Sequence, residues 1–172
     1  MFECDRALAR ACVTAVVFTT LSSGVSVAEQ ASRKPATPAA SGQTAPILPG
    51  PYGDMISRHA ARYGIPPALA DAVVRVESRH NAKARNGSNI GLTQISYGTA
   101  RRMGYRGGVE GLYDPDTNLS FGIRYLGDAY RLAGGDTCIT VLKYQAGHGA
   151  RRMTSASSRY CAKVRTHLAA VR

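Results

Sequence analysis

From Tyr52 to the C-terminus the apolar residues of this chain recur at helical spacing, and this pattern constrains the fold more than any other feature of the sequence. Glycine and proline interrupt the pattern at Gly64, Pro66-Pro67, Gly104 and Gly134-Gly135, where helices are expected to begin or end. No alternating run of polar and apolar residues is long enough to predict a strand. The sequence therefore predicts a mainly α fold.

The helices can be placed approximately from these breaks and from residues suited to helix starts. The expected helices are residues 55–63, a helix that opens at Pro66-Pro67, residues 96–103, a helix from Asp114 to Gly134, a helix capped by Asp136 or Thr137, and residues 158–171. The glycine-rich stretch around Glu110 is expected to form an exposed loop.

The first 28 residues have the layout of a secretory signal peptide. Arg6 and Arg10 precede an apolar run from Ala11 to Leu21, which is too short to cross a membrane comfortably. Small residues follow at Ser26 and Ala28, so we expect cleavage after Ala28.

Residues 29–51 are rich in proline, alanine, serine and glycine and show no apolar period, which predicts a flexible linker. Residues 52–172 then form a single domain, long enough to bury an ordinary core. We expect an exported protein of this kind to act in the periplasm or outside the cell, as a monomer.

The net charge is +11, and almost all of it comes from arginine. A basic surface attracts polyanions such as nucleic acid, an anionic membrane or an acidic cell wall. It is also a common property of a well-solvated surface with no specific partner. Export argues against nucleic acid, and the sequence has no recognisable basic helix or aromatic platform that would bind it.

Cysteine usage agrees with export, because an oxidising compartment favours disulfides. Cys4 and Cys12 lie in the predicted signal peptide, which leaves Cys138 and Cys161 in the mature chain. The sequence favours a disulfide between these two over a pair of buried thiols, and a loop of this length would stabilise the fold by about 3 kcal/mol. Their spacing is not the CxxC of a redox or zinc site, so neither a metal nor a cofactor is expected.

One glutamate of the predicted domain stands beside apolar residues on a helix. Glu77 follows Val73 and Val74, which share its side of the helix. Apolar contact and the negative end of the helix dipole both raise the pKa of a carboxyl, and a carboxyl that keeps its proton near neutral pH can act as a general acid. Arg75 and Arg79 would lower that pKa if they paired with Glu77, and a solvated surface glutamate is the simpler interpretation.

Two other segments contain residues suited to binding a ligand. The stretch NGSNIGLTQIS (86–96) suits a tight loop that brings the amide of Gln94 toward a ligand, or a plain turn with a solvated Gln94. In LKYQAGHGARR (142–152), a helix that carries Tyr144 ends in a glycine-rich turn. A tyrosine at this place can bind a sugar ring or fill the core.

Together these segments resemble the soluble lytic transglycosylase (SLT) domain family over nearly all of residues 52–165. The ordered set of motifs, rather than any one of them, carries the resemblance. The set comprises Glu77-Ser78 with Asn81 and Ala84, Gly91-Leu92-Thr93-Gln94-Ile95, Thr99-Ala100 with Gly104, Tyr113-Asp114-Pro115 with Asn118-Leu119, Gly122 with Tyr125-Leu126, and Tyr144 with Ala146-Gly147.

The resemblance implies a lysozyme-like fold that cleaves peptidoglycan between N-acetylmuramic acid and N-acetylglucosamine. It implies that Glu77 is the single acid/base, which protonates the glycosidic oxygen and then accepts the proton of the muramic C6 hydroxyl as that oxygen attacks C1. The product is a 1,6-anhydro sugar, and no second carboxylate is needed, unlike in the usual glycosidase scheme. The resemblance also makes Gln94 and Tyr144 cleft residues and places Ser78 in support of Glu77.

The chain departs from the family pattern near the expected substrate. Thr93 stands where the family often has methionine and Gln145 replaces an asparagine, so we expect both at the substrate with altered contacts. The stretch between Glu77 and Gln94 is slightly shorter than the common pattern. Similar short loops occur in transglycosylases of secretion and conjugation machines, which makes a cell-envelope complex a candidate partner besides the peptidoglycan glycan strands.

Two other functions stay open at this point. A hydrolytic lysozyme on the same fold would need a positioned water and usually a second carboxylate. Asp114 and Asp116 are the nearest candidates in the sequence, although both suit the start of a helix better. A non-catalytic module for cell-wall binding or assembly would use only the basic surface.

Overall fold

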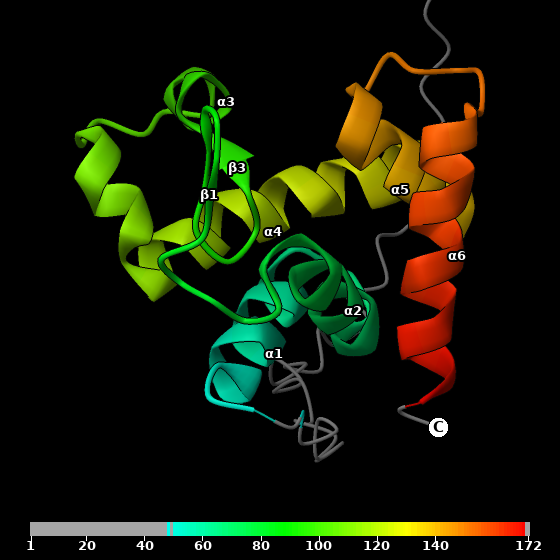
Figure 1. The fold of residues 1–172 in the computed structure, drawn as a ribbon, viewed down its shortest axis with the longest axis horizontal. Coiled ribbons are helices and arrows are strands. Elements are labelled where there is room, and N and C mark those ends of the chain that lie inside the picture. Colours follow the sequence, from blue (N-terminus) through cyan, green and yellow to red (C-terminus); the bar gives the residue numbers. More distant parts are fainter. Residues whose placement is uncertain (1–47, 49, 171–172) are drawn as a thin grey trace, which may run out of the picture. The chain divides into compact units, whose positions relative to one another are not determined.

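The computed structural model describes residue 48 and residues 50–170. In this part of the chain the elements are α1 (Gly53–Arg62), α2 (Pro67–Ser78), β1 (Arg85–Asn86), β2 (Asn89–Ile90), β3 (Ile95–Ser96), α3 (Tyr97–Arg102), the 3-10 helix η1 (Val109–Tyr113), α4 (Pro115–Leu132), α5 (Thr137–Ala146) and α6 (Ser155–Ala169). The predicted mainly α fold is confirmed (Figure 1). No helix in the described part of the chain is long and apolar enough to span a membrane.

The predicted signal peptide (1–28) lies outside the described residues, and so does most of the predicted linker (29–51). Both stay predictions. Leu48 belongs to the predicted linker but is buried against the helical core. Packing against the domain therefore begins slightly before the expected boundary at residue 52.

Capping residues begin the helices largely where the sequence predicts. The side chains of Ser96, Asp114 and Asp136 accept hydrogen bonds from backbone N–H groups in the first turns of α3, α4 and α5. The last helix starts earlier than expected, because the hydroxyl of Thr154 accepts a hydrogen bond from the N–H of Ser157.

The segment between α2 and α4 differs from the sequence prediction in two ways. The strands β1, β2 and β3 form an antiparallel sheet in that order, with Arg85 opposite Ile90 and Asn89 opposite Ser96. Each strand has only two residues, which is too short for an alternating pattern to be visible in the sequence. The stretch around Glu110 forms the helix η1 rather than a loop, although Glu110 itself is exposed as expected.

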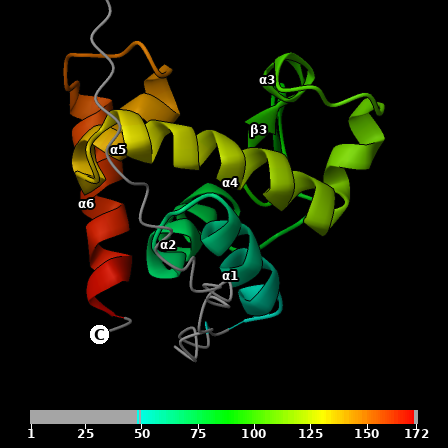
Figure 2. The same ribbon diagram turned by 180° about the vertical axis from the view of Figure 1, so that it is seen from behind.

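The larger hydrophobic core is built mainly from α1, α2, α4, α5 and α6. Figures 1 and 2 show α4 crossing the domain, with α1 packed along it and α5 at its C-terminal end, while α2 packs on α1 and α6. The apolar positions that recur at helical spacing point inward, and their fully buried members include Ile56, Val73, Val74, Leu119, Ile123, Leu126, Val141 and Val164.

The predicted disulfide between Cys138 and Cys161 is present. It joins the first turn of α5 to the middle of α6, with the two Cα atoms 5.2 Å apart. Because α6 also packs on α2, the disulfide helps to hold three helices in one arrangement.

A second, smaller core lies at the other end of α4. It is formed by residues from the sheet, α3, η1 and the turn between them, namely Ile90, Ile95, Ala100, Tyr105 and Leu112. In Figure 1 this group of elements (green) lies apart from α5 and α6 (orange and red). The chain therefore has two packed regions that share α4.

The side chain of Asn118, near the start of α4, joins these regions. Its Oδ1 accepts hydrogen bonds from the N–H of Thr93 (2.9 Å) and the hydroxyl of Thr93 (2.7 Å). Its Nδ2 donates to the carbonyl oxygens of Ile90 and Leu112, both at 2.8 Å. Gly91 adopts a left-handed φ of +72°, and a Cβ there would collide with Asn118, so this turn requires glycine.

We expect Asn118→Ala to lower the free energy of unfolding by about 3 kcal/mol, because it leaves buried backbone groups of three residues without partners. Urea unfolding measures the change. Asn81→Ala is the matched control, since Asn81 makes one exposed hydrogen bond to the N–H of Lys83. The control is expected to change stability by less than about 0.5 kcal/mol. Equal losses in the two variants would contradict the role given to Asn118.

Candidate active site

A cleft of about 720 Å³ lies between the two packed regions. Its walls come from the end of α2, the sheet with its turns, the start of α3, and the facing sides of α4, α5 and α6. The lining residues are Val76, Glu77, Ser78, Arg79, Ala84, Arg85, Asn86, Asn89, Gln94, Ile95, Ser96, Thr99, Tyr125, Tyr144, Gln145, Gly147, Tyr160 and Lys163. The structure thus brings together segments that are far apart in the sequence.

Glu77 lies in the last turn of α2 and lines this cleft. The hydroxyl of Tyr160, from α6, donates a hydrogen bond of 2.6 Å to Glu77 Oε1. Burial raises the pKa of Glu77 above its ordinary value of 4.5, while the hydrogen bond from Tyr160 acts to lower it. Among the described residues, neither Arg75 nor Arg79 forms an ion pair with Glu77. The carboxyl therefore keeps the raised pKa that its apolar neighbours predict.

The chain turns sharply at the end of α2, which leaves Glu77 at the cleft wall. Arg79 and His80 both adopt left-handed backbone conformations, with φ of 53° and 62°. Two such residues in succession end the helix and redirect the chain toward the sheet. Ser78 lines the cleft beside Glu77, but its hydroxyl donates to the carbonyl oxygen of Val74 (3.1 Å) within the helix. Ser78 thus supports the helix end rather than Glu77 directly.

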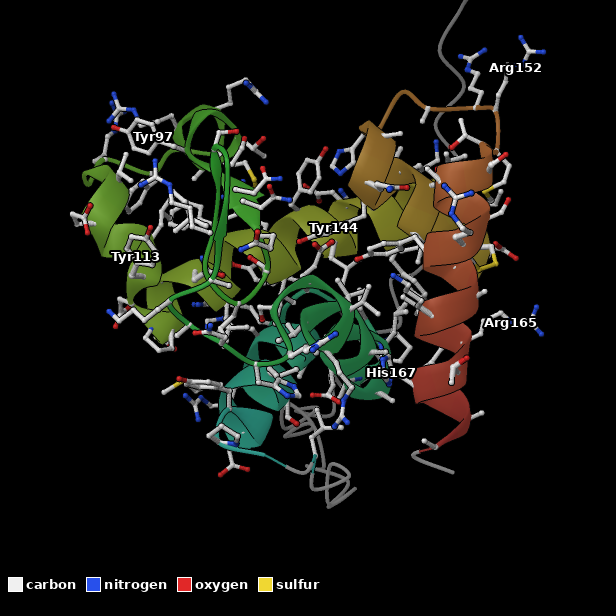
Figure 3. The ribbon with its side chains drawn as sticks, in the orientation of Figure 1. Tyr97, Tyr113, Tyr144, Arg152, Arg165 and His167 are labelled. Atoms are coloured by element: carbon white, nitrogen blue, oxygen red, sulfur yellow. A yellow bond between two sulfur atoms is a disulfide. The ribbon has the colours of Figure 1, made fainter. Side chains whose placement is uncertain are left out.

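Tyr144 lies at the base of the cleft, between the sheet and α6 (Figure 3). Its hydroxyl donates a hydrogen bond of 2.6 Å to the carbonyl oxygen of Thr93. Burial, and after it the charge of Glu77, raise the pKa of Tyr144 well above its ordinary value, and the same two causes act on the pKa of Tyr160. Both hydroxyls therefore keep their protons and remain donors.

Gln94 lines the cleft from the turn before β3, in a left-handed conformation with φ of 48°. Its side-chain nitrogen donates to the carbonyl oxygens of Ala84 (3.2 Å) and Gly91 (3.0 Å). This arrangement is not the plain turn with a solvated glutamine. Because both amide hydrogens have protein partners, the group left for a ligand is the amide oxygen, an acceptor.

The structure places Thr93 differently from the sequence prediction. Its side chain is 1% exposed and does not line the cleft, because its hydroxyl is bonded to Asn118. The side chain packs against Gly122 of α4, where a Cβ would collide with it. Only the carbonyl oxygen of Thr93 acts on the cleft, through Tyr144. Gln145, by contrast, is exposed and lines the cleft, and the hydrogen bonds among the described residues include none to its side chain.

Two tyrosines of the cleft were not predicted from the sequence to lie at the substrate, although Tyr125 belongs to one of the family motifs. Tyr160 lies on α6 and reaches Glu77 across 83 positions of sequence, so no local pattern connects them. Tyr125 lies on α4 and stacks on the ring of His148, with ring centroids 4.0 Å apart and planes 17° apart. A tyrosine on an amphipathic helix looks the same in sequence whether it fills a core or faces a cleft. Only the helix packing distinguishes the two cases.

The other candidate carboxylates lie outside the cleft. Asp114 caps α4, and the backbone hydrogen bond from Thr117 lowers its pKa. Asp116 pairs with His59 at 3.0 Å and with Arg58 at 3.9 Å. Glu77 is the only carboxylate that lines the cleft in the described part of the chain. That part also contains no cluster of side chains that could hold a metal ion.

We expect Tyr160→Phe to raise the pKa of Glu77 further, because the variant removes the hydrogen bond that favours the carboxylate. A pH titration of the Glu77 side-chain carbon by NMR measures this shift. Tyr144→Phe is the matched control, since the Tyr144 hydroxyl donates to Thr93 and not to the carboxyl. An unchanged Glu77 pKa in Tyr160→Phe would show that this hydrogen bond does not act on the acid.

The raised pKa also predicts how Glu77 affects stability. A group whose pKa is higher in the folded state contributes stability below its unfolded pKa and loses that contribution as the pH rises through the folded pKa. A glutamine side chain does not titrate, so Glu77→Gln should gain thermal stability over the wild type as the pH rises from about 4 to about 8. Thermal unfolding at several pH values checks this, and a difference that shrinks with rising pH would contradict it.

Comparison with known proteins agrees with this geometry. The family model of the transglycosylase SLT domain matches residues 54–163. The soluble lytic murein transglycosylase of Escherichia coli K12 is 33% identical over 109 residues, which are 59% of this chain and 17% of that protein. The membrane-bound lytic murein transglycosylase E of Buchnera aphidicola is 36% identical over 83 residues, which are 44% of this chain and 38% of that protein.

Solved structures show the same fold. The 70 kDa soluble lytic transglycosylase of Escherichia coli matches with a TM-score of 0.55 and 27% identity, over 69% of this chain and 19% of that one. An inactive mutant of the lytic transglycosylase Slt from Pseudomonas aeruginosa matches with a TM-score of 0.61 and 22% identity, over 69% of this chain and 23% of that one. This chain thus spans only a small part of these larger relatives. By its match to the family model, the chain belongs to the transglycosylase SLT domain family.

Proposed function

We propose that this protein is a lytic transglycosylase that cleaves the β-1,4 bond between N-acetylmuramic acid and N-acetylglucosamine in peptidoglycan, with Glu77 as its single acid/base. The observation that carries the proposal is the combination found in the cleft: one half-buried carboxyl with a raised pKa and, among the described residues, no second carboxylate in the lining. A mechanism that recycles one proton through one carboxyl needs no other acid or base.

The hydrogen bonding of Glu77 suggests how the proton moves. Oε1 accepts the hydrogen bond from Tyr160, which leaves Oε2 to hold the proton. Oε2–H protonates the glycosidic oxygen as the bond from that oxygen to C1 breaks. The C6 hydroxyl oxygen of the muramic sugar then attacks C1, its proton returns to Oε2, and a 1,6-anhydro ring closes without water.

The two opposing effects on the Glu77 pKa suit this cycle. The acid must hold a proton before the bond breaks and must be stable as a carboxylate directly afterwards. Burial favours the first form, and the hydrogen bond from Tyr160 favours the second. Since Tyr160 keeps its own proton, it can donate to Oε1 throughout the cycle.

The rest of the cleft offers contacts suited to a sugar chain. Tyr125 and Tyr144 contribute aromatic surface, with ring centroids 5.6 Å apart. Gln94 contributes an amide oxygen that can accept a hydrogen bond from a sugar hydroxyl. Relatives carry the names soluble and membrane-bound lytic murein transglycosylase, which supports a glycan strand of peptidoglycan as the substrate. Export by the predicted signal peptide would bring the protein to this substrate in the periplasm.

We expect Glu77→Gln to lower the cleavage rate by at least about 100-fold, because glutamine keeps the shape of the side chain but carries no proton to transfer. Mass spectrometry of digested peptidoglycan measures the 1,6-anhydro products. Glu110→Gln is the matched control: it makes the same chemical change at an exposed position outside the cleft and should leave the rate unchanged. The Pseudomonas variant described as inactive also replaces a glutamate by glutamine.

The same digestion separates the competing functions. Reducing muramic ends in place of anhydro ends would show hydrolysis and would reject the transglycosylase. Release of anhydro products by Glu77→Gln at the wild-type rate would reject Glu77 as the acid. If the wild type releases neither product but still binds peptidoglycan, the protein is a non-catalytic wall-binding module.

A further inference from the structure

A second hollow, of about 490 Å³, lies between the end of α2 and α6. Its lining residues are basic with one exception and include no aspartate or glutamate; they are Arg75, Val76, Arg79, His80, Lys163 and His167. We call this set the basic hollow. Figure 3 shows His167 in the space between α6 and α2, whereas Arg165 extends away from α2. The basic side chains are thus gathered on the side of α6 that faces α2.

Few protein carboxylates lie against these basic side chains. Among the described contacts with carboxylates, the one that involves this set is the hydrogen bond between His80 Nε2 and Asp71 Oδ1, at 2.8 Å. The Asp71 side chain is 2% exposed, so it anchors His80 from the protein interior. The described hydrogen bonds include none from the side chains of Arg75, Arg79 or Lys163, so these side chains can donate to a ligand, and the imidazole of His167 has a donor in either protonation state. Such a set matches a carboxylate-bearing ligand.

The basic hollow is continuous with the active-site cleft. Val76, Arg79 and Lys163 line both of them, and Glu77 lies between Val76 and the turn at Arg79. A chain that branches from a sugar bound at Glu77 can therefore leave the cleft past Arg79 and Lys163. The hollow is open rather than enclosed by the fold, since both of these side chains are exposed.

We propose that the basic hollow binds the carboxylates of the peptide stem carried by the muramic sugar in the cleft. This inference rests on the proposed function. A stem tethered to a bound sugar meets the hollow at a high effective concentration, which a free anion or an acidic protein lacks. The continuity of the two sites therefore favours the stem over the other anionic ligands. The hollow would make the protein selective for glycan strands that still carry peptides.

Kinetics on two substrates test this assignment. The variant Arg75→Gln/His167→Gln changes two residues that line the hollow but not the cleft. We expect the variant to have a higher KM than the wild type for peptidoglycan strands that carry their stems. This rise should be roughly tenfold larger than the rise for strands whose stems an amidase has removed. The control Arg62→Gln/Arg165→Gln removes two exposed arginines outside both sites and should change neither KM. Equal changes on the two substrates, or none, would overturn the proposal.

Direct binding separates this proposal from the function it rests on, because it needs no catalysis. In the Glu77→Gln protein, NMR should show a free stem peptide shifting the amide signals at the end of α2 and in α6. The shifts should disappear with Arg75→Gln/His167→Gln and with a stem peptide whose carboxyls are amidated. Equal binding of the amidated peptide would overturn carboxylate recognition. Tighter binding of polyglutamate than of the stem peptide would assign the hollow to an acidic protein instead.

If the wild type gives no anhydro product from either substrate, the proposed function fails while the binding experiment still decides the ligand of the basic hollow. If anhydro product forms but removal of the stems leaves KM unchanged in the wild type and in the variants, the proposed function stands and the inference about the hollow fails. The two failures are therefore distinguishable.

Discussion

The position of the cleft depends on the carboxamide of Asn118. Its four hydrogen bonds use both lone-pair directions of the oxygen and both hydrogens of the nitrogen, so a buried polar group is fully satisfied. They hold the turn at Thr93 against α4, and the carbonyl oxygen of Thr93 in turn holds Tyr144. One side chain in the core thereby sets the distance between the sheet and α5, the two sides of the cleft. A buried backbone group left without its hydrogen bond to Asn118 would lower the free energy of unfolding by more than most surface contacts contribute to it.

Two effects act on the pKa of Glu77, and they come from different parts of the chain. Burial results from α2 and the walls around it, and the hydrogen bond comes from Tyr160 on α6. α6 is fixed relative to α5 by the disulfide at Cys161, next to Tyr160 in sequence. The disulfide therefore has a role beyond overall stability, because it restrains the helix that carries the partner of the proposed acid.

Most of the helices could be predicted from the sequence, since caps such as Asp114 and the apolar spacing are local signals. The disulfide followed from having two cysteines in an exported chain, and the raised pKa of Glu77 from valines one turn earlier. The sheet was missed because two-residue strands carry no period. Thr93 was expected at the substrate, but a partner 25 positions away draws its hydroxyl into the core. Tyr160 was missed for the same reason, since its role depends on a contact between distant helices.

The direction in which side chains leave α2 separates Glu77 from Arg75, the cation that comes two positions before it in the sequence. Arg75 precedes Glu77 by two positions, and residues two apart on an α-helix point about 200° away from one another. Arg75 accordingly lines only the basic hollow, while Glu77 lines only the cleft. A cation paired with the carboxyl would lower its pKa. Arg79 and Lys163 line the same cleft as Glu77, but the described ion pairs include none to Glu77. Helix geometry therefore lets the same short segment, VRVESR (74–79), present the proposed acid to the cleft and Arg75 to the basic hollow.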